Sequence, residues 1–182
     1  MVFETLGIPV YYADTRAKEL MNTDPALKAA LTGYFGKEIY HGDGLDRRKL
    51  ADIIFNDKTA LEKVNSWVHP TVARDFEQWH SRQTSPYSLE EAAIIFESNL
   101  ARHFDKVILV AAPDDLRIER VCAREQISPE VVRQRMTNQW PDEKKIAMAD
   151  YVIYNDNSHL IIPQVMEIHK LLLNRYTLES TS

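Results

Sequence analysis

Four short apolar runs, separated by segments of helical periodicity, most constrain the fold of this 182-residue chain. They are residues 8–12, 91–96, 106–112 and 150–154. The second and third runs lack polar alternation, which is typical of parallel strands covered on both faces. Strands that alternate with helices predict an α/β domain with a mostly parallel sheet.

The helical segments between these runs carry recognisable start and stop signals. The expected helices begin or extend over residues 15–22, 24–35, 46–55, 58–83, 114–124, 128 onward and 160–175. Asp24-Pro25 combines an N-cap residue with a first-turn proline, as does the Ser-Pro pair at 128–129. Pro70 predicts that the helix over 58–83 ends or kinks near His69. Residues 2–6 before Gly7 are typical of a last helical turn with a glycine stop.

Composition narrows the class of protein. The net charge is −5, which favours neither nucleic acid nor an anionic membrane as a partner. The only cysteine, Cys122, excludes an intrachain disulfide, and the 6 histidines show no metal-ligand spacing. No run approaches the roughly 20 apolar residues of a membrane span, and the first residues do not form a signal peptide. We expect a soluble cytoplasmic protein without a metal site.

Acidic side chains follow the predicted strands where ligands bind in such sheets. Asp14 comes directly after the first strand and is placed to accept a proton from a substrate hydroxyl. The simpler interpretation is that Asp14 caps the helix beginning at Thr15. Glu97, directly after the second run, also has a functional and a structural interpretation. It either holds Mg²⁺ through water or positions substrate, or it caps the residues that follow. His69 fits a structural residue at a helix kink.

An arginine set lies downstream of the third strand. Arg117, Arg120 and Arg124 share one helix face, and Arg133 and Arg135 follow on the next helix, with Gln139 one turn beyond. One interpretation is a solvated helix face on which nearby glutamates compensate the arginine charges. The other is a lid whose arginines neutralise the charge of a transferring phosphoryl group. The residues alone leave both open.

Seven segments in order resemble one enzyme family. They are GIPVYYAD (7–14), LDRRKLADIIF (45–55), VHP (68–70), AAIIFE (92–97), RVCAR (120–124), RMTNQ (135–139) and ADYVIYN (149–155). Together they span about residues 3–175 and are similar to dephospho-coenzyme A kinases. The VHP and ADYVIYN segments argue against a nucleoside monophosphate kinase.

The resemblance implies a fold, a reaction and roles for named residues. The expected fold is a three-layer P-loop kinase-like α/β fold with a core (about 1–22, 85–113 and 148–178), a helical substrate region (about 23–84) and a lid (about 114–147). The implied reaction is phosphorylation of the ribose 3′-hydroxyl of dephospho-coenzyme A by ATP with Mg²⁺, the last step of coenzyme A synthesis. The implied roles are catalysis by Asp14, Arg120 and Arg124, substrate binding by Arg47, His69 and Glu97, and nucleotide or lid contacts by Arg135, Gln139 and Asn155.

One departure from the family pattern concerns phosphate binding. Gly-x-x-x-x-Gly-Lys-Ser/Thr, whose amides and lysine hold the phosphates, occurs nowhere in the chain, and the first strand of the family pattern is missing with it. Two explanations are open: the natural protein is longer and active, or the loss is real and the chain is a non-catalytic coenzyme A-binding or regulatory homologue. We favour the first, because Asp14 and the lid arginines remain. The 182-residue form is expected to be a poor kinase, and its open strand edges predict low stability or self-association.

Overall fold

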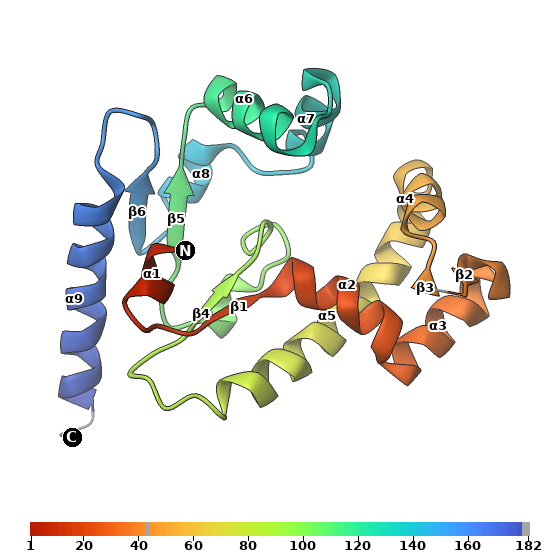
Figure 1. The fold of residues 1–182 in the computed structure, drawn as a ribbon, viewed down its shortest axis with the longest axis horizontal. Coiled ribbons are helices and arrows are strands. Elements are labelled where there is room, and N and C mark those ends of the chain that lie inside the picture. The colour runs from red at the N-terminus through yellow and green to blue at the C-terminus, as the bar shows by residue number, and fades with distance from the viewer. Residues whose placement is uncertain (43, 180–182) are drawn as a thin grey trace. The chain divides into compact units, whose positions relative to one another are not determined.

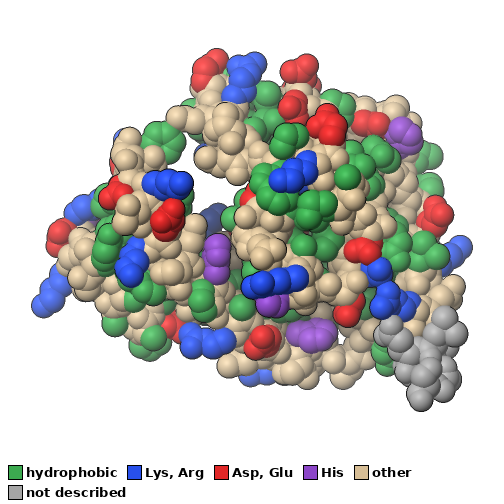
Figure 2. Space-filling model, turned by 180° about the vertical axis from the view of Figure 1, so that it is seen from behind, with side chains coloured by type: hydrophobic (Ala, Val, Ile, Leu, Met, Phe, Trp, Pro, Cys, Tyr) green, Lys and Arg blue, Asp and Glu red, His purple; other side chains and the backbone are tan. Residues whose placement is uncertain are grey.

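The computed structural model describes residues 1–42 and 44–179 and divides into two compact units. The helical unit is Ile8–Ala92, and the C-terminal unit combines Met1–Gly7 with Ala93–Ser182. No helix in the described residues is long and apolar enough to cross a bilayer. Lys and Arg side chains are interspersed with Asp and Glu on the face shown in Figure 2, in keeping with the modest net charge of −5.

The helical unit places four helices beside two small strand pairs. Figure 1 labels the α-helices and strands of this unit. Its elements are β1 (Val10–Tyr12), α2 (Ala13–Thr23), α3 (Pro25–Phe35), η1 (Lys37–Ile39), β2 (Tyr40–His41), β3 (Gly44–Leu45), α4 (Arg47–Asn56), α5 (Lys58–His80) and β4 (Leu89–Glu91). β1 pairs with β4 in parallel, and β2 pairs with β3 antiparallel. The short β2–β3 pair lies between the helices predicted over 24–35 and 46–55.

Carboxylate caps set the helix starts of this unit. The Asp24 carboxylate accepts from the Leu27 amide at 2.8 Å, and the Asp46 carboxylate accepts from the Lys49 amide at 2.9 Å. Each cap satisfies an amide that has no partner within the helix. The helix starts predicted at these two aspartates are confirmed.

The core of the helical unit is made of aliphatic side chains from α2, α3, α4 and α5 and the short segments between them. It consists of Leu20, Leu27, Leu31, Ile39, Leu45, Leu50, Val64 and Val68. Leu31 and Ile39 are both 0% exposed. This cluster joins the helices that carry Arg47 and His69 into one packed body.

Pro70 lies inside α5 without ending it. The helix is continuous over Lys58–His80, so of the two predicted outcomes, an end or a kink near His69, the end does not occur. A proline removes one amide donor, and the carbonyl that loses its partner is that of Ser66, an exposed residue. Val64 and Val68, which are buried before Pro70, and Thr71, which is buried after it, show that packing spans the proline. Tertiary burial on both sides therefore outweighs the local cost.

The C-terminal unit surrounds a parallel strand pair with helices. Its elements are α1 (Val2–Thr5), η2 (Ala101–His103), β5 (Ile108–Ala111), α6 (Asp114–Glu125), α7 (Pro129–Met136), α8 (Asp142–Ile146), β6 (Tyr151–Tyr154) and α9 (Ile161–Glu179). β5 and β6 pair in register from Ile108 opposite Tyr151 to Ala111 opposite Tyr154. Figure 1 shows α9 running alongside β6. After α1, Gly7 adopts a φ of 79°, which confirms the predicted glycine stop.

The strand predicted over 91–96 is displaced in the structure. β4 ends at Glu91, and residues 93–99 form consecutive turns in which the Ser98 amide donates to the Ile94 carbonyl at 3.0 Å. Of this run only Phe96 is buried, and Ile94 is 37% exposed, so the run lacks the burial on both faces that the strand prediction assumed. Glu97 therefore lies in a turn and not at the end of a strand.

The class of fold agrees with the sequence, although the strands are fewer per sheet than expected. The chain is α/β, and two of its three strand pairs are parallel. Among the described residues, each sheet contains two strands.

Candidate functional site

Asp14 is the second residue of α2 and lies two positions after the last residue of β1. The N-cap of α2 is Tyr12, which provides no side-chain cap. The simpler interpretation, in which Asp14 caps this helix, therefore does not hold. Its side chain is exposed, and it makes no hydrogen bond or ion pair within the described residues. A carboxylate in the first turn benefits from the positive end of the helix dipole and remains available to a ligand.

A hydrogen-bonded triad fixes the segment that carries Asp14. The Arg16 guanidinium binds the Asp75 carboxylate through Nε at 2.9 Å and Nη2 at 2.8 Å. The Tyr11 hydroxyl donates to the same carboxylate at 2.7 Å. Such bidentate geometry is the strong form of an ion pair. It ties β1 and α2 to α5 and holds the backbone on both sides of Asp14.

The triad also shifts the pKa values of its members. Burial, followed by the hydrogen bond to Asp75, raises the pKa of the Tyr11 hydroxyl, so Tyr11 stays a donor at neutral pH. The hydrogen bond from Arg16 lowers the pKa of Asp75, so this carboxylate stays ionised. Both ionisation states favour the observed hydrogen bonds.

A pocket of about 390 Å³ lies against this triad. It is lined by residues of β1, α2 and α5 and by one residue that follows α5, namely Val10, Tyr11, Tyr12, Thr15, Arg16, Asp75, Gln78, Trp79 and Arg82. Asp14 is not among its lining residues, although the neighbouring Thr15 is. The pocket is therefore adjacent to the segment of Asp14 and is distinct from it.

Arg47 and His69, predicted to bind substrate, differ in exposure. Arg47 is exposed at the first residue of α4, and the contact that it makes within the described residues, to the Lys18 carbonyl at 3.5 Å, is too long to hold it firmly. His69 is half-buried in α5, and burial lowers its pKa. At neutral pH His69 is therefore an uncharged imidazole that can offer a hydrogen bond but no charge.

Two of the predicted lid arginines share one carboxylate in the C-terminal unit. Glu125 accepts from Arg124 at 2.7 Å and from Arg135 at 2.6 Å. The hydrogen bond from Arg124, followed by that from Arg135, lowers the pKa of Glu125. These two arginines are mostly exposed, and their charges are partly compensated. This arrangement matches the solvated-face interpretation for Arg124 and Arg135.

Arg117 joins two helices of the lid segment. It binds Asp114 at 2.6 Å and Asp142 at 3.2 Å, and Asp142 also pairs with Lys145 at 3.0 Å. Asp142 lies in α8, so its ion pair with Arg117 joins α6 to α8, whereas Lys145, which is 6% exposed, pairs with Asp142 within α8. The role of Arg117 in this geometry is to hold the helices together.

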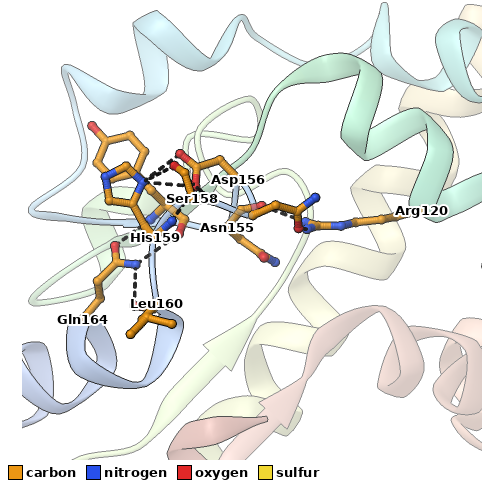
Figure 3. A network of polar contacts seen from close by, with 9 residues as sticks. Arg120, Asn155, Asp156, Ser158, His159, Leu160 and Gln164 are labelled. Carbon is orange, nitrogen blue, oxygen red and sulfur yellow. Dashed lines mark hydrogen bonds and ion pairs between the residues drawn. The ribbon is translucent and has the colours of Figure 1, made fainter.

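Arg120 is half-buried and differs from the other arginines of the set. It donates to the Asn155 carbonyl at 2.8 Å and to Asn157 Oδ1 at 2.7 Å. Figure 3 shows Arg120 pointing toward Asn155. Both acceptors are neutral, and Arg120 forms no ion pair with any acidic residue in the described part of the chain. The structure brings the predicted residues Arg120 and Asn155 together and leaves the charge of Arg120 uncompensated.

Glu97 and Gln139 lie near the start of α8. One oxygen of Glu97 accepts from the Trp140 amide at 2.7 Å. The other, Oε2, is buried and has no hydrogen-bond partner in the structure. Gln139 lines a pocket of about 510 Å³ at the carboxyl end of β5, together with Arg117 and Tyr154. Glu97 therefore has one oxygen with a structural task and one that is free for a ligand or a water.

Solved structures define the class of this fold. The chain superposes on a crystal structure from Thermus thermophilus with a TM-score of 0.82 at 31% identity, covering 94% of this chain and 87% of that one. It also superposes on the dephospho-CoA kinase of Campylobacter jejuni with a TM-score of 0.67 at 25% identity, covering 96% and 90%. The fold is that of the P-loop kinase-like α/β enzymes.

Sequence comparison resolves the class to one family. The family model described as "Dephospho-CoA kinase" matches residues 1–160. The dephospho-CoA kinase of Porphyromonas gingivalis is 43% identical over 165 residues, which are 90% of this chain and 82% of that protein. The dephospho-CoA kinase of Bacteroides fragilis is 35% identical over 175 residues, which are 96% of this chain and 85% of that protein. The chain belongs to the dephospho-CoA kinase family, whose members are phosphotransferases.

Sequence reasoning missed the residues that hold the predicted ones in place. Asp75 is one, because nothing in a helical pattern marks it as the partner of Arg16. Asn157 and Asp156 are others, although the run Asn-Asp-Asn-Ser-His at 155–159 is typical of side chains that bind nearby backbone and gave a usable signal.

Proposed function

We propose that this protein transfers the γ-phosphoryl group of ATP to the ribose 3′-hydroxyl of dephospho-coenzyme A, giving coenzyme A and ADP. Family membership over residues 1–160 and the names of the relatives support this reaction. The structural observation that carries it is Arg120, a half-buried cation held by neutral acceptors. Such a group suits an anion that develops charge during transfer.

The proposed chemistry assigns the proton and the charge to separate residues. Asp14 accepts the proton of the 3′-hydroxyl while the hydroxyl oxygen attacks the γ-phosphorus. The bond between the γ-phosphorus and the β–γ bridging oxygen breaks, which releases ADP. Arg120 and Arg124 stabilise charge on the transferring group. Arg124 is ion-paired with Glu125 at 2.7 Å, so it must leave Glu125 before it can bind the phosphate.

The remaining predicted residues take binding roles in this proposal. Arg47, His69 and Glu97 bind the acceptor substrate, and Arg135, Gln139 and Asn155 serve the nucleotide and the lid. The proposal retains the core, the helical substrate region and the lid with the boundaries expected from the sequence, whereas the compact helical unit of the structure is Ile8–Ala92. Arg47 and His69 lie in the helical unit, whereas the others lie in the C-terminal unit.

Magnesium would enter with ATP. Within the described residues no group of three or more His, Cys, Asp or Glu side chains is arranged to hold a metal. The buried, unpartnered Oε2 of Glu97 fits a water ligand of Mg²⁺, and the phosphates would supply the direct ligands. When bound, the ion would neutralise phosphate charge.

A second candidate function is a coenzyme A-binding or regulatory protein without transfer activity. The observation that favours it is that the 182 residues contain no Gly-x-x-x-x-Gly-Lys-Ser/Thr segment. The same observation leads us to expect slow turnover for the 182-residue polypeptide even when the kinase proposal holds, because few groups cradle the ATP phosphates.

Separate titrations and a product assay distinguish the two functions. We expect dephospho-coenzyme A and ATP each to bind, and coenzyme A to form at a measurable rate. Binding of dephospho-coenzyme A without ATP binding and without product would favour the regulatory protein instead.

Asp14→Asn tests the assignment of the proton acceptor. It should lower kcat by about 10²–10⁴-fold and leave the Kd of dephospho-coenzyme A nearly unchanged, because the amide keeps the shape and loses the basicity. Asp52→Asn, at an exposed position of α4, is the matched control and should keep wild-type kcat. Normal turnover in the Asp14 variant would remove Asp14 from the mechanism.

A further inference from the structure

The loop between β6 and α9, residues 155–160, supplies both acceptors for Arg120. Nη1 of Arg120 donates to the Asn155 carbonyl, and Nη2 donates to the side-chain oxygen of Asn157. Figure 3 shows Arg120 reaching this loop from the neighbouring helix α6. Two donors at 2.8 and 2.7 Å fix both the position and the plane of the guanidinium.

The base of this loop is closed by Gln164 of α9. The Tyr154 amide donates to the Gln164 side-chain oxygen at 2.8 Å. The Gln164 amide group donates to the carbonyls of Tyr154 at 3.1 Å and Leu160 at 3.0 Å. At the same end the Asn155 amide donates to the Ala111 carbonyl at 2.8 Å. Both ends of the loop are therefore attached to regular structure.

The tip of the loop is closed by Asp156. Its carboxylate accepts from the Ser158 amide at 2.9 Å, the Ser158 hydroxyl at 2.9 Å and the His159 amide at 3.0 Å, and it also contacts His159 Nδ1 at 2.8 Å. Desolvation raises the pKa of Asp156, but the hydrogen bonds from Ser158 and His159 outweigh it, and the net pKa is lowered. An ionised Asp156 thus organises the turn in which Asn157 sits.

Asn157 has the backbone conformation that such a tip requires. Its φ is 68°, in the left-handed region that asparagine and glycine adopt more easily than other residues. In this conformation its side-chain oxygen accepts from Arg120 Nη2. Asparagine is thus suited to the position by its backbone as well as by its acceptor.

The neutrality of the acceptors separates this contact from the other arginine contacts of the lid. Arg117, Arg124 and Arg135 are each held by carboxylates, which compensate their charge. Arg120 is held as firmly without compensation. An aspartate in place of Asn157 would hold the guanidinium at the cost of its availability to an anion.

We propose that Asn157 is a positioning residue for Arg120, which fixes the guanidinium toward the transferring phosphoryl group while leaving its charge uncompensated. This inference rests on the proposed function for its effect on turnover. The geometry itself, an arginine immobilised by the 155–160 loop, is independent of that function.

A set of variants at position 157 separates the acceptor from the backbone. Asn157→Gly keeps the positive φ and removes the acceptor, and Asn157→Asp keeps an acceptor and adds a charge. We expect Asn157→Gly to lower kcat/KM about tenfold, the usual effect of losing one hydrogen bond to a charged group. Asn157→Asp should lower kcat at least as much and leave Arg120 immobile. Asn99→Gly, at another exposed asparagine of positive φ (57°), is the matched control and should be silent.

A double-mutant cycle tests whether Asn157 acts through Arg120. In an Arg120→Ala background, Asn157→Gly should have no further effect on kcat/KM. An undiminished tenfold loss in that background would show that Asn157 serves the structure in general and would overturn the proposal.

A spectroscopic measurement checks the geometry without any need for turnover. Rotation of the Arg120 guanidinium about its Nε–Cζ bond, followed by ¹⁵N NMR, should be slow in the wild type and in Asn157→Asp and fast in Asn157→Gly. Unchanged rotation in Asn157→Gly would overturn the proposal. Absence of coenzyme A formation by the wild type would count against the proposed function alone, and the rotation rates would still decide the placement of Arg120.

Discussion

Single side chains of this protein differ chiefly in whether their charge is already compensated. Asp14 and Arg120 carry charges without an opposite partner in the described residues, whereas Asp75 and Arg124 are ion-paired. An uncompensated charge beside water costs little and remains available to a ligand. This difference ranks the predicted site residues more sharply than their positions in the sequence do.

The ranking leads to a prediction for the lid arginines. Arg120→Ala should lower kcat/KM for phosphoryl transfer by about 10²-fold, as for other removed groups that stabilise a transition state. Arg124→Ala should have a smaller effect, because ligand binding must first separate Arg124 from Glu125. Arg133→Ala, at an exposed position with only a 3.8 Å ion pair to Glu130, serves as the control. Steady-state kinetics of the three variants check the order, and an equal loss in all three would contradict it.

Glu90 on β4 gives a prediction for the pH dependence of stability. Burial raises its pKa from the ordinary 4.5 to about 7. Because the folded pKa lies above the unfolded one, Glu90 costs no stability below pH 4.5, and its cost grows as the pH rises to about 7 and then stays constant. Glu90→Gln should raise the free energy of unfolding at pH 8 by about 1–2 kcal/mol, a value reduced because the carboxyl is only partly buried.

Denaturant unfolding at several pH values measures this effect. The gain of the Glu90→Gln variant should vanish at pH 4.5, where the wild-type carboxyl is protonated in the folded state. Glu77→Gln, at an exposed position of α5, is the matched control and should not stabilise the protein at pH 8. A gain that is equal at both pH values would contradict the raised pKa.

At the scale of elements, local signals predict helix starts well and strand limits poorly. Asp24 and Asp46 mark their helices because the cap is a bond within a few residues. The run at 91–96 misleads because its lack of alternation predicts burial on both faces, whereas only Phe96 of the run is buried. The proline in α5 misleads because burial of Val68 and Thr71 holds the helix across it. Contacts that are distant in sequence decide both cases.

The packing of α3 provides a prediction at this scale. Leu31→Ala should lower the free energy of unfolding by about 3 kcal/mol, since Leu31 is 0% exposed and its truncation leaves a cavity. Leu61→Ala on α5, where the side chain is 37% exposed, is the matched control and should cost well under half as much. If denaturant unfolding gave the same loss in free energy of unfolding for Leu31→Ala and Leu61→Ala, the prediction for Leu31 would be contradicted.

At the scale of the whole molecule, the strand pairs leave backbone edges. Every strand of the two parallel sheets has one partner within the described residues, and Val110 of β5 is 56% exposed. Open edges with apolar side chains favour pairing between molecules. The expectation of self-association therefore stays a prediction with a structural basis.

Sedimentation at increasing protein concentration tests this expectation. The apparent mass should rise with concentration, and Val110→Lys should reduce the rise, because a lysine on a strand opposes pairing. Ala123→Lys on the exposed side of α6 adds the same charge away from the strands and should leave the rise unchanged. A monomeric wild type at all concentrations would contradict the prediction.

The sequence by itself determined the α/β class, the family and the residues placed to carry charge, because periodicity, caps and ordered motifs are local properties. Only the tertiary structure decided which of those charges are compensated. Asp75 binds Arg16 across 59 positions, and Asn157 binds Arg120 across 37. No local pattern encodes such partners, since they are set by how the elements pack. The structure therefore separates Arg120, held and uncompensated, from the arginines that the sequence alone could not distinguish from it.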